Sequence, residues 1–154
     1  MGISKDNRFY RHWFAALASF IDRDADRANH LLARCAQACS ASYSERVYRR
    51  AFAEGRSLPE ALALLKQEFA DFDYALLDDR VEVYYSHCGC DLVADGVIST
   101  PRLCHCSELS LLHNWEAIYG KGNVSVKLLS SVLAGDQRCA FEVRVAAGDT
   151  ARSQ

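Results

Sequence analysis

Apolar side chains in the first seventy residues recur at intervals of three and four, which is the spacing of one face of an α-helix. Phe9, Trp13 and Leu17 form the first stripe of this kind, and Phe20 or Ile21 continues it. We therefore expect a helix over this segment.

Three more helices are predicted before any strand. One covers residues 25–42, and the next follows from residue 43 and ends at Gly55. The last opens at residues 57–60, Ser-Leu-Pro-Glu, where the serine and glutamate have capping-box spacing and the proline suits a first helical turn. We expect this helix to continue through Phe69.

Beyond Phe72 the hydrophobic period falls to two, which indicates β-strands. Residues 74–77 and 80–87 flank a two-aspartate turn, so they are predicted to form a hairpin. A cysteine-bearing connection over residues 88–103 then leads to a helix around residues 107–119.

Two further strands, over residues 124–133 and 138–145, are expected to close the fold through a tight turn. Helices followed by antiparallel strands, with a cysteine-bearing crossover helix, predict an α+β fold. We expect one domain over residues 1–154, with a helical part over about 7–70 and a sheet-and-cysteine part over about 72–146.

The composition of the chain predicts its cellular location and argues against two classes of partner. No apolar run approaches the roughly 20 residues of a membrane span, so no membrane partner is expected. The polar residues 1–7 lack the apolar segment of a signal peptide, which predicts a cytoplasmic protein. Arg46, Arg49 and Arg50 are too few to make a nucleic-acid surface, so we expect no nucleic-acid partner.

The chain has seven cysteines, and four of them form two C-x-C pairs. An odd number of cysteines in a reducing cytoplasm favours a metal site or thiol chemistry over a disulfide framework. Four thiolates at about 2.3 Å from the metal would make a closed tetrahedral zinc site, and an iron–sulfur cluster is the alternative. The ligand set predicted here is Cys88, Cys90, Cys104 and Cys106, and the alternatives are a reactive thiol without metal or buried thiols that only pack.

Residues two apart point the same way only in extended backbone, whereas on a helix they diverge by about 200°. The first pair follows a predicted strand and meets this requirement. If Thr100 caps a helix whose first turn holds Pro101, then Cys104 and Cys106 face apart. If Ser107 is the cap instead, both thiols lie just ahead of the helix, where the helix dipole favours thiolate.

Five further residues are additional ligand candidates. Cys35 and Cys39 are four apart on a predicted helix, so they are either further ligands, a redox pair or small side chains at a helix contact. Cys139 is predicted on the core face of the last strand, where it either packs or binds metal. His87 and His105 are candidates because each is adjacent to a cysteine.

A thiol enzyme would also need a base. His105 lies between two cysteines and points away from both in extended backbone, so His113 is the better candidate. It follows Cys106 by seven residues on the same helix face, with Glu116 placed to orient it. Seven residues span about 10 Å along a helix, so a water or substrate would have to lie between thiol and imidazole.

Three segments carry a resemblance to known proteins. They read Y-Y-S-H-C-G-C-D-L-V-A-D-G-V-I from residue 84, T-P-R-L-C-H-C-S-E-L from residue 100 and S-S-V-L-A-G-D-Q-R-C-A-F-E-V from residue 130. They resemble prokaryotic cysteine-rich proteins related to the L-2-amino-thiazoline-4-carboxylic acid hydrolases. More distantly, they are similar to the 4-vinyl reductase-like domain of small-ligand sensors.

The resemblance implies a sandwich in which an antiparallel sheet and helices enclose a pocket for a small organic molecule. In the aromatic-sensing relatives, zinc is held by cysteines at positions matching Cys106 and Cys139, with a glutamate and another cysteine between them. Residues 126–132 offer neither residue type, so Cys88, Cys90 or Cys104 would have to complete the set.

These observations lead to competing hypotheses. The first is a small-molecule-binding protein with a pocket lined by Trp13, Tyr85 and Trp115 beside the cysteines. As an enzyme it would hydrolyse a thiazoline or a related C–N or C–S substrate, with Cys106 as nucleophile or metal ligand. The second is a non-catalytic ligand-sensing or metal-binding module, dimeric through its amino-terminal helices. The third is an iron–sulfur or redox thiol protein.

Overall fold

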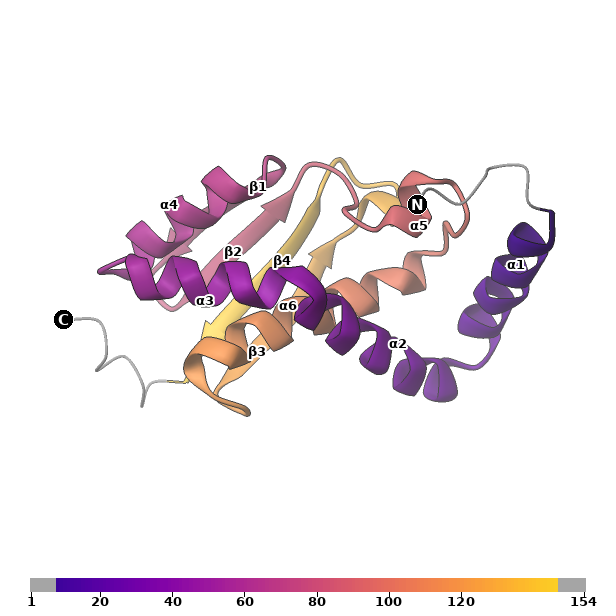
Figure 1. Cartoon of the computed structure of the whole chain (residues 1–154), viewed down its shortest axis with the longest axis horizontal. Helices are drawn as coiled ribbons and strands as arrows, with labels where there is room; N and C mark the ends of the chain where they lie inside the picture. The colour runs from indigo at the N-terminus through magenta and orange to yellow at the C-terminus, as the bar shows by residue number, and fades with distance from the viewer. Residues whose placement is uncertain (1–7, 147–154) are drawn as a thin grey trace.

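The computed structural model describes residues 8–146 and begins with helices (Figure 1). The helices that precede the first strand are α1 (Arg8–Arg23), α2 (Ala25–Cys39), α3 (Glu45–Glu54) and α4 (Leu58–Glu68). A π-helical turn, Ser40–Ser44, joins α2 to α3 where an ordinary helical end had been expected. The four predicted helices are confirmed; the π-helical turn departs from the prediction, and α4 ends at Glu68 rather than at Phe69.

Four strands form one antiparallel sheet in the order β1-β2-β4-β3. Their bounds are β1 (Phe72–Leu77), β2 (Arg80–Tyr85), β3 (Val124–Ser130) and β4 (Cys139–Val145). The amino-terminal helices precede the strands, so the predicted α+β class is confirmed. β3 is shorter than predicted because the chain turns into a 3-10 helix, Val132–Ala134.

The crossover between β2 and β3 holds a short helix, α5 (Asp91–Ala94), a 3-10 turn (Pro101–Leu103) and the long helix α6 (Cys104–Tyr119). Thr100 caps the 3-10 turn, because its side chain accepts a hydrogen bond from the backbone N–H of Arg102 at 3.3 Å. The alternative in which Ser107 caps the helix is therefore wrong, since helical backbone has already begun before that residue.

One face of the sheet is covered by α3, α4 and α6 (Figure 1). Trp115 of α6 is 0% exposed and packs among Tyr48, Leu62 and Phe141, which come from α3, α4 and β4. Cys139, Phe141 and Val143 alternate toward this main core, as predicted from the sequence.

The opposite face of the sheet is charged. Arg80 of β2 lies 3.3 Å from the carboxylate of Glu82 and 3.4 Å from that of Glu142 on β4. Arg144 reaches Glu142 at 2.9 Å and also pairs with Asp79 in the hairpin turn. Apolar residues on one side and ion pairs on the other are the pattern of a sheet covered on a single face.

A second, smaller core joins α1 and α2 to the crossover. It consists of Ile21, Ala28, Leu32, Ile98 and Leu103. α1 lies at one end of the molecule and buries only part of its apolar surface here (Figure 1).

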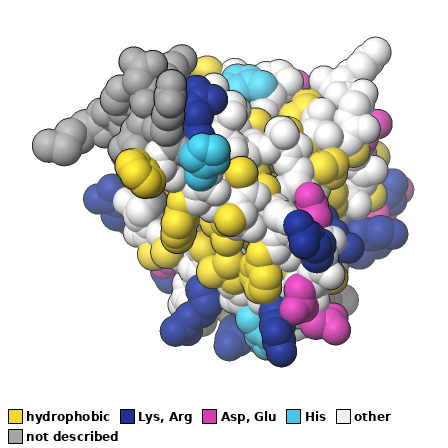
Figure 2. All heavy atoms as spheres, turned by 90° about the vertical axis from the view of Figure 1, so that its right-hand side faces the viewer, with side chains coloured by type: hydrophobic (Ala, Val, Ile, Leu, Met, Phe, Trp, Pro, Cys, Tyr) yellow, Lys and Arg dark blue, Asp and Glu magenta, His cyan; other side chains and the backbone are white. Residues whose placement is uncertain are grey.

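The outer face of α1 carries exposed aromatic side chains. Phe9 is 88% exposed and Trp13 is 65% exposed, whereas Ile21 is buried. Figure 2 faces this end of the molecule and shows apolar side chains gathered on its surface. The dimer through the amino-terminal helices stays a prediction. No helix within residues 8–146 is both long enough and apolar enough to span a membrane.

The corner between α3 and α4 leaves no room for a side chain. A Cβ added to Gly55 would lie 2.7 Å from the backbone nitrogen of Ala61 and 2.9 Å from the carbonyl oxygen of Ala51. Gly55→Ala is therefore expected to lower the free energy of unfolding by about 1–3 kcal/mol, through overpacking. Urea denaturation of the variant and the unchanged protein measures this difference in the free energy of unfolding.

Gly89→Ala is the matched control, because a Cβ at that position meets nothing within 4 Å. It is expected to change the free energy of unfolding by less than about 0.5 kcal/mol. Equal stability of the two variants would contradict the close approach of α3 and α4 at this corner.

Candidate thiol site

Cys106 lies in the first turn of α6 and packs, together with Cys90, against the smaller core. Burial of its thiol is the main reason why the pKa is raised to about 12, and repulsion from four neighbouring thiols adds to the rise. Those thiols, in decreasing order of effect, are Cys35, Cys39, Cys90 and Cys88. Because such repulsion fades with distance, the five cysteines share one neighbourhood, which we call the thiol site.

α2 contributes Cys35 and Cys39, which are four residues apart and so lie on one side of the helix. Both are exposed, whereas Ala36 between them is buried against the rest of the protein. Partial burial is the main reason why the pKa of Cys39 is raised, and repulsion from Cys90 and then from Asp91 raises it further. The two α2 thiols therefore flank the helix contact and open to solvent.

The loop after β2 contributes Cys88 and Cys90. Cys90 is the residue before α5 and has extended backbone, with φ −83° and ψ 121°. Burial raises the pKa of Cys88, and a hydrogen bond donated by the backbone N–H of Cys90 to the Cys88 sulfur works in the opposite direction. This short loop thus places the two thiols of the first C-x-C pair near each other.

The two side chains of the second C-x-C pair point to different sides of the helix that carries them. Cys104 and Cys106 both belong to α6, so their side chains diverge by about 200°. Cys104 is 3% exposed, and its sulfur lies 2.8 Å from the hydroxyl oxygen of Ser131. The buried Cys139 is close enough to raise the pKa of Cys104, after the larger effect of burial.

The four thiols of the two C-x-C pairs therefore do not lie together at one site. Cys104 and Cys139, which are both buried, form an inner pair, while Cys106 belongs to the thiol site. Cys88 lies between the two groups, because Cys90, Cys139 and Cys104 all contribute to its raised pKa after burial.

The thiols are spread more widely than a single ion requires. Within residues 8–146, no three histidine, cysteine, aspartate or glutamate side chains lie close enough to hold one metal ion. Zinc–sulfur bonds of about 2.3 Å would bring neighbouring sulfurs to about 3.8 Å from each other. A single zinc ion held by four thiolates would require this spacing.

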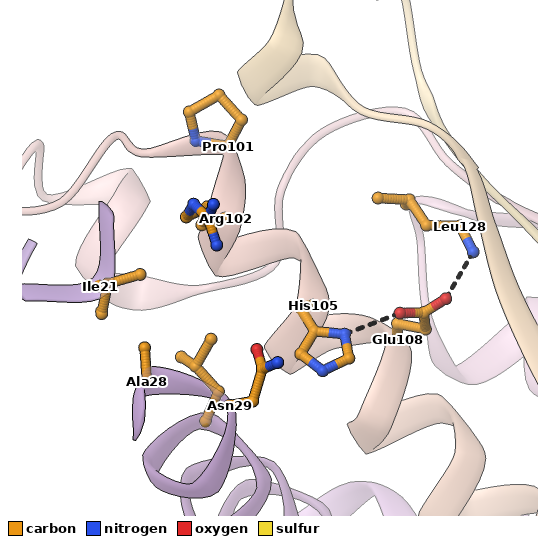
Figure 3. A pocket seen from close by; sticks show the side chains of 9 residues that line it. Ile21, Ala28, Asn29, Pro101, Arg102, His105, Glu108 and Leu128 are labelled. Atoms are coloured by element: carbon orange, nitrogen blue, oxygen red, sulfur yellow. Dashed lines mark hydrogen bonds and ion pairs between the residues drawn. The ribbon is translucent and has the colours of Figure 1, made fainter. Parts of the chain in front are cut away.

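The two histidines proposed as ligands face carboxylates. The Nε2 atom of His87 lies 3.6 Å from a carboxylate oxygen of Asp71, and the imidazole is exposed. The Nδ1 atom of His105 lies 2.8 Å from Glu108, whose other oxygen accepts the backbone N–H of Leu128 at 2.8 Å (Figure 3). The hydrogen bond to Glu108 thus orients the imidazole of His105, whereas the contact between His87 and Asp71 is longer.

The predicted catalytic residues Cys106, His113 and Glu116 lie along α6. His113 is seven residues from Cys106, which corresponds to about 10 Å along the helix axis. Glu116 accepts a hydrogen bond from the backbone N–H of Gly122 at 2.8 Å, so its carboxylate closes the turn after α6. Their catalytic roles stay a prediction.

A buried carboxamide that the sequence reasoning missed holds α2 against α6. Asn114 is 4% exposed, and its Oδ1 atom accepts hydrogen bonds from the hydroxyls of Ser40 at 2.7 Å and Ser44 at 3.0 Å. The two serines belong to the π-helical turn, a feature found frequently at functional sites. Serines four apart inside a helical pattern were the only available signal.

A pocket of about 300 Å³ lies beside the smaller core (Figure 3). The pocket predicted between Trp13, Tyr85 and Trp115 is wrong, because Trp115 is enclosed in the main core and Trp13 is exposed on α1. The residues that line the observed pocket are Ile21, Ala28, Asn29, Leu32, Pro101, Arg102, His105, Glu108 and Leu128.

Comparisons of the chain with known protein families and with curated proteins find no match. The functional argument therefore depends on the geometry of the thiols and of the pocket.

Asn114→Ala should destabilise the fold, because the hydroxyls of Ser40 and Ser44 would lose their acceptor. The expected loss is about 2–3 kcal/mol in the free energy of unfolding, measured by urea denaturation. Ser42→Ala is the control, since that exposed hydroxyl donates only to the carbonyl of Cys39, three residues earlier in the chain. Unchanged stability of Asn114→Ala would contradict the role of the carboxamide.

Cys106 should react slowly with iodoacetamide in metal-free protein. Alkylation requires the thiolate, and a pKa raised to about 12 keeps the thiol protonated at pH 8. The rate should rise about tenfold per pH unit between pH 8 and 11, as the thiolate fraction grows. Mass spectrometry of peptides follows the reaction, with the urea-unfolded chain as reference. Equal rates at pH 8 in folded and unfolded chains would exclude the buried thiol described here.

Proposed function

We propose that this protein is a non-catalytic thiol module that binds a soft metal centre through Cys35, Cys39, Cys90 and Cys106. The supporting observation is that thiols from α2 and from the loop after β2 lie near enough to Cys106 of α6 to raise its pKa. Thiolates are the ligands preferred by zinc and by iron–sulfur clusters. Cys88 is an alternative ligand, because its thiol lies next to the same site.

A metal centre would remove the unfavourable electrostatics of the site. Several thiols held together resist ionisation, since burial and mutual repulsion both disfavour thiolate. A coordinating cation reverses this preference, because a thiol bound to a metal is deprotonated outright. A reactive nucleophile would need the thiolate without such help. The arrangement therefore favours metal binding over nucleophilic catalysis.

The spacing of the thiols favours an iron–sulfur cluster over a single zinc ion. No three of these side chains converge as tightly as one ion needs, and two of the ligands, Cys35 and Cys39, lie at the solvent edge. A cluster distributes its cysteine ligands around several iron atoms, so it tolerates greater separation. A reducing cytoplasm, where free thiols persist, is the compartment that this proposal implies.

The hydrolase remains the competing candidate, on the strength of the resemblance. It would use Cys106 as nucleophile and His113 as proton carrier, with the substrate between them. Turnover of a thiazoline carboxylate by metal-free protein, abolished by Cys106→Ala, would favour this candidate over the metal module.

The metal proposal is tested on the full chain, purified without oxygen and reconstituted with iron and sulfide. We expect visible absorption and bound iron and sulfide, all lost in the Cys90→Ser and Cys106→Ser variants. Cys104→Ala and Cys139→Ala, which change only the inner pair, should retain the absorption. Circular dichroism of each variant confirms that it has folded.

Three outcomes would count against the proposal. Retention of the centre by Cys106→Ser would exclude the ligand set, as would its loss only in the inner-pair variants. Seven freely titrating thiols in reconstituted protein would exclude a metal centre altogether. One colourless zinc per chain, lost on the same substitutions, would support the thiol site and overturn the preference for iron and sulfide.

A further inference from the structure

The pocket beside the smaller core has no part in the proposed metal centre. Figure 3 shows it between α2, which carries Ala28 and Asn29, and the segment that carries Arg102 and His105. Leu128 of β3 lines another wall. The pocket is thus framed by α1, α2, α6, the 3-10 turn before α6 and one strand.

Most of the pocket wall is apolar. Ile21, Ala28, Leu32, Pro101 and Leu128 all contribute to it. A cavity of about 150 Å³ can hold benzene, so about 300 Å³ accommodates a ligand of about ten non-hydrogen atoms. The ligand body that suits this wall is a short hydrocarbon or a single aromatic ring.

The polar groups in the pocket are unequally engaged. Both carboxylate oxygens of Glu108 are occupied, one by the backbone N–H of Leu128 and one by His105. The guanidinium of Arg102, in contrast, has no ion-pair partner among the described residues. Asn29 is exposed on the facing helix and adds amide donors. The available charge in the pocket is therefore positive.

We propose that this pocket binds a small monocarboxylate, with the carboxylate on Arg102 and Asn29 and the apolar body against the wall of the smaller core. A guanidinium offers two parallel N–H donors that match a carboxylate. A ligand ammonium group finds less to bind, because Glu108 is already engaged by its two donors. A monoanion thus fits better than a zwitterion.

This site does not depend on the metal centre, although the two are neighbours. Ile21, Ala28 and Leu32 line the pocket and belong to the smaller core against which Cys90 and Cys106 pack. A ligand that binds only the folded chain stabilises it. Ligand binding should thus raise the melting temperature of the protein both with and without the metal centre.

The test titrates full-length protein with phenylacetate and with its neutral analogue phenylacetamide, followed by ¹H–¹⁵N NMR. Phenylacetate should shift the backbone signals of residues 28, 29, 102 and 105, and phenylacetamide should bind at least tenfold more weakly. Arg102→Gln should weaken phenylacetate binding about tenfold to hundredfold, which is the effect of losing a charged hydrogen bond.

Arg34→Gln is the matched control, because it removes the same charge from an exposed position on α2. It should leave the affinity unchanged, and Asn29→Ala should lower it several-fold without unfolding this surface position. The titration is repeated on Cys106→Ser, so a failed metal proposal leaves this result standing.

Equal binding of acid and amide would overturn the carboxylate assignment. Full affinity in a folded Arg102→Gln variant, shifts confined to other parts of the chain, or no shift at millimolar phenylacetate would overturn the site itself.

Discussion

The carboxamide of Asn114 is the contact on which the candidate site depends. It is buried at the crossing of α2 and α6 and accepts hydrogen bonds from two hydroxyls of the π-helical turn. A buried amide without these partners would be costly, so the two helices are held in one relative position. Because Cys35 and Cys39 belong to α2 and Cys106 belongs to α6, that position also sets the distance between their thiols.

The start of α6 decides how the cysteines divide. Thr100 and Pro101 begin a 3-10 turn, so helical geometry already applies at Cys104. The same two-residue spacing that would join two thiols on a strand here buries Cys104 beside Ser131 and places Cys106 at the thiol site. The residue at which helical backbone begins thus decides which cysteine joins the inner pair and which joins the thiol site.

Local patterns predicted much of this fold. The Ser57 cap was recognisable from its spacing, and the structure confirms that its hydroxyl accepts the N–H of Glu60. The alternation that placed Cys139 on the core face was also sufficient, because strand geometry is local. The partnership of Asn114 with the π-helical turn was not predictable, since it joins positions about seventy residues apart. The pocket at Arg102 likewise exists only once α2 and α6 have packed.

The two faces of the sheet differ sharply in polarity, and this has a consequence for how the strands find their partners. Val83 faces Phe141 across β2 and β4, while Glu82 and Glu142 lie on the opposite side with arginines. A slip of one residue in either strand would turn its hydrophobic side chains to water and carry a carboxylate into the core. A misregistered pairing of β2 with β4 is thus penalised on both faces of the sheet, which reduces the number of competing β-structures that the folding chain can form.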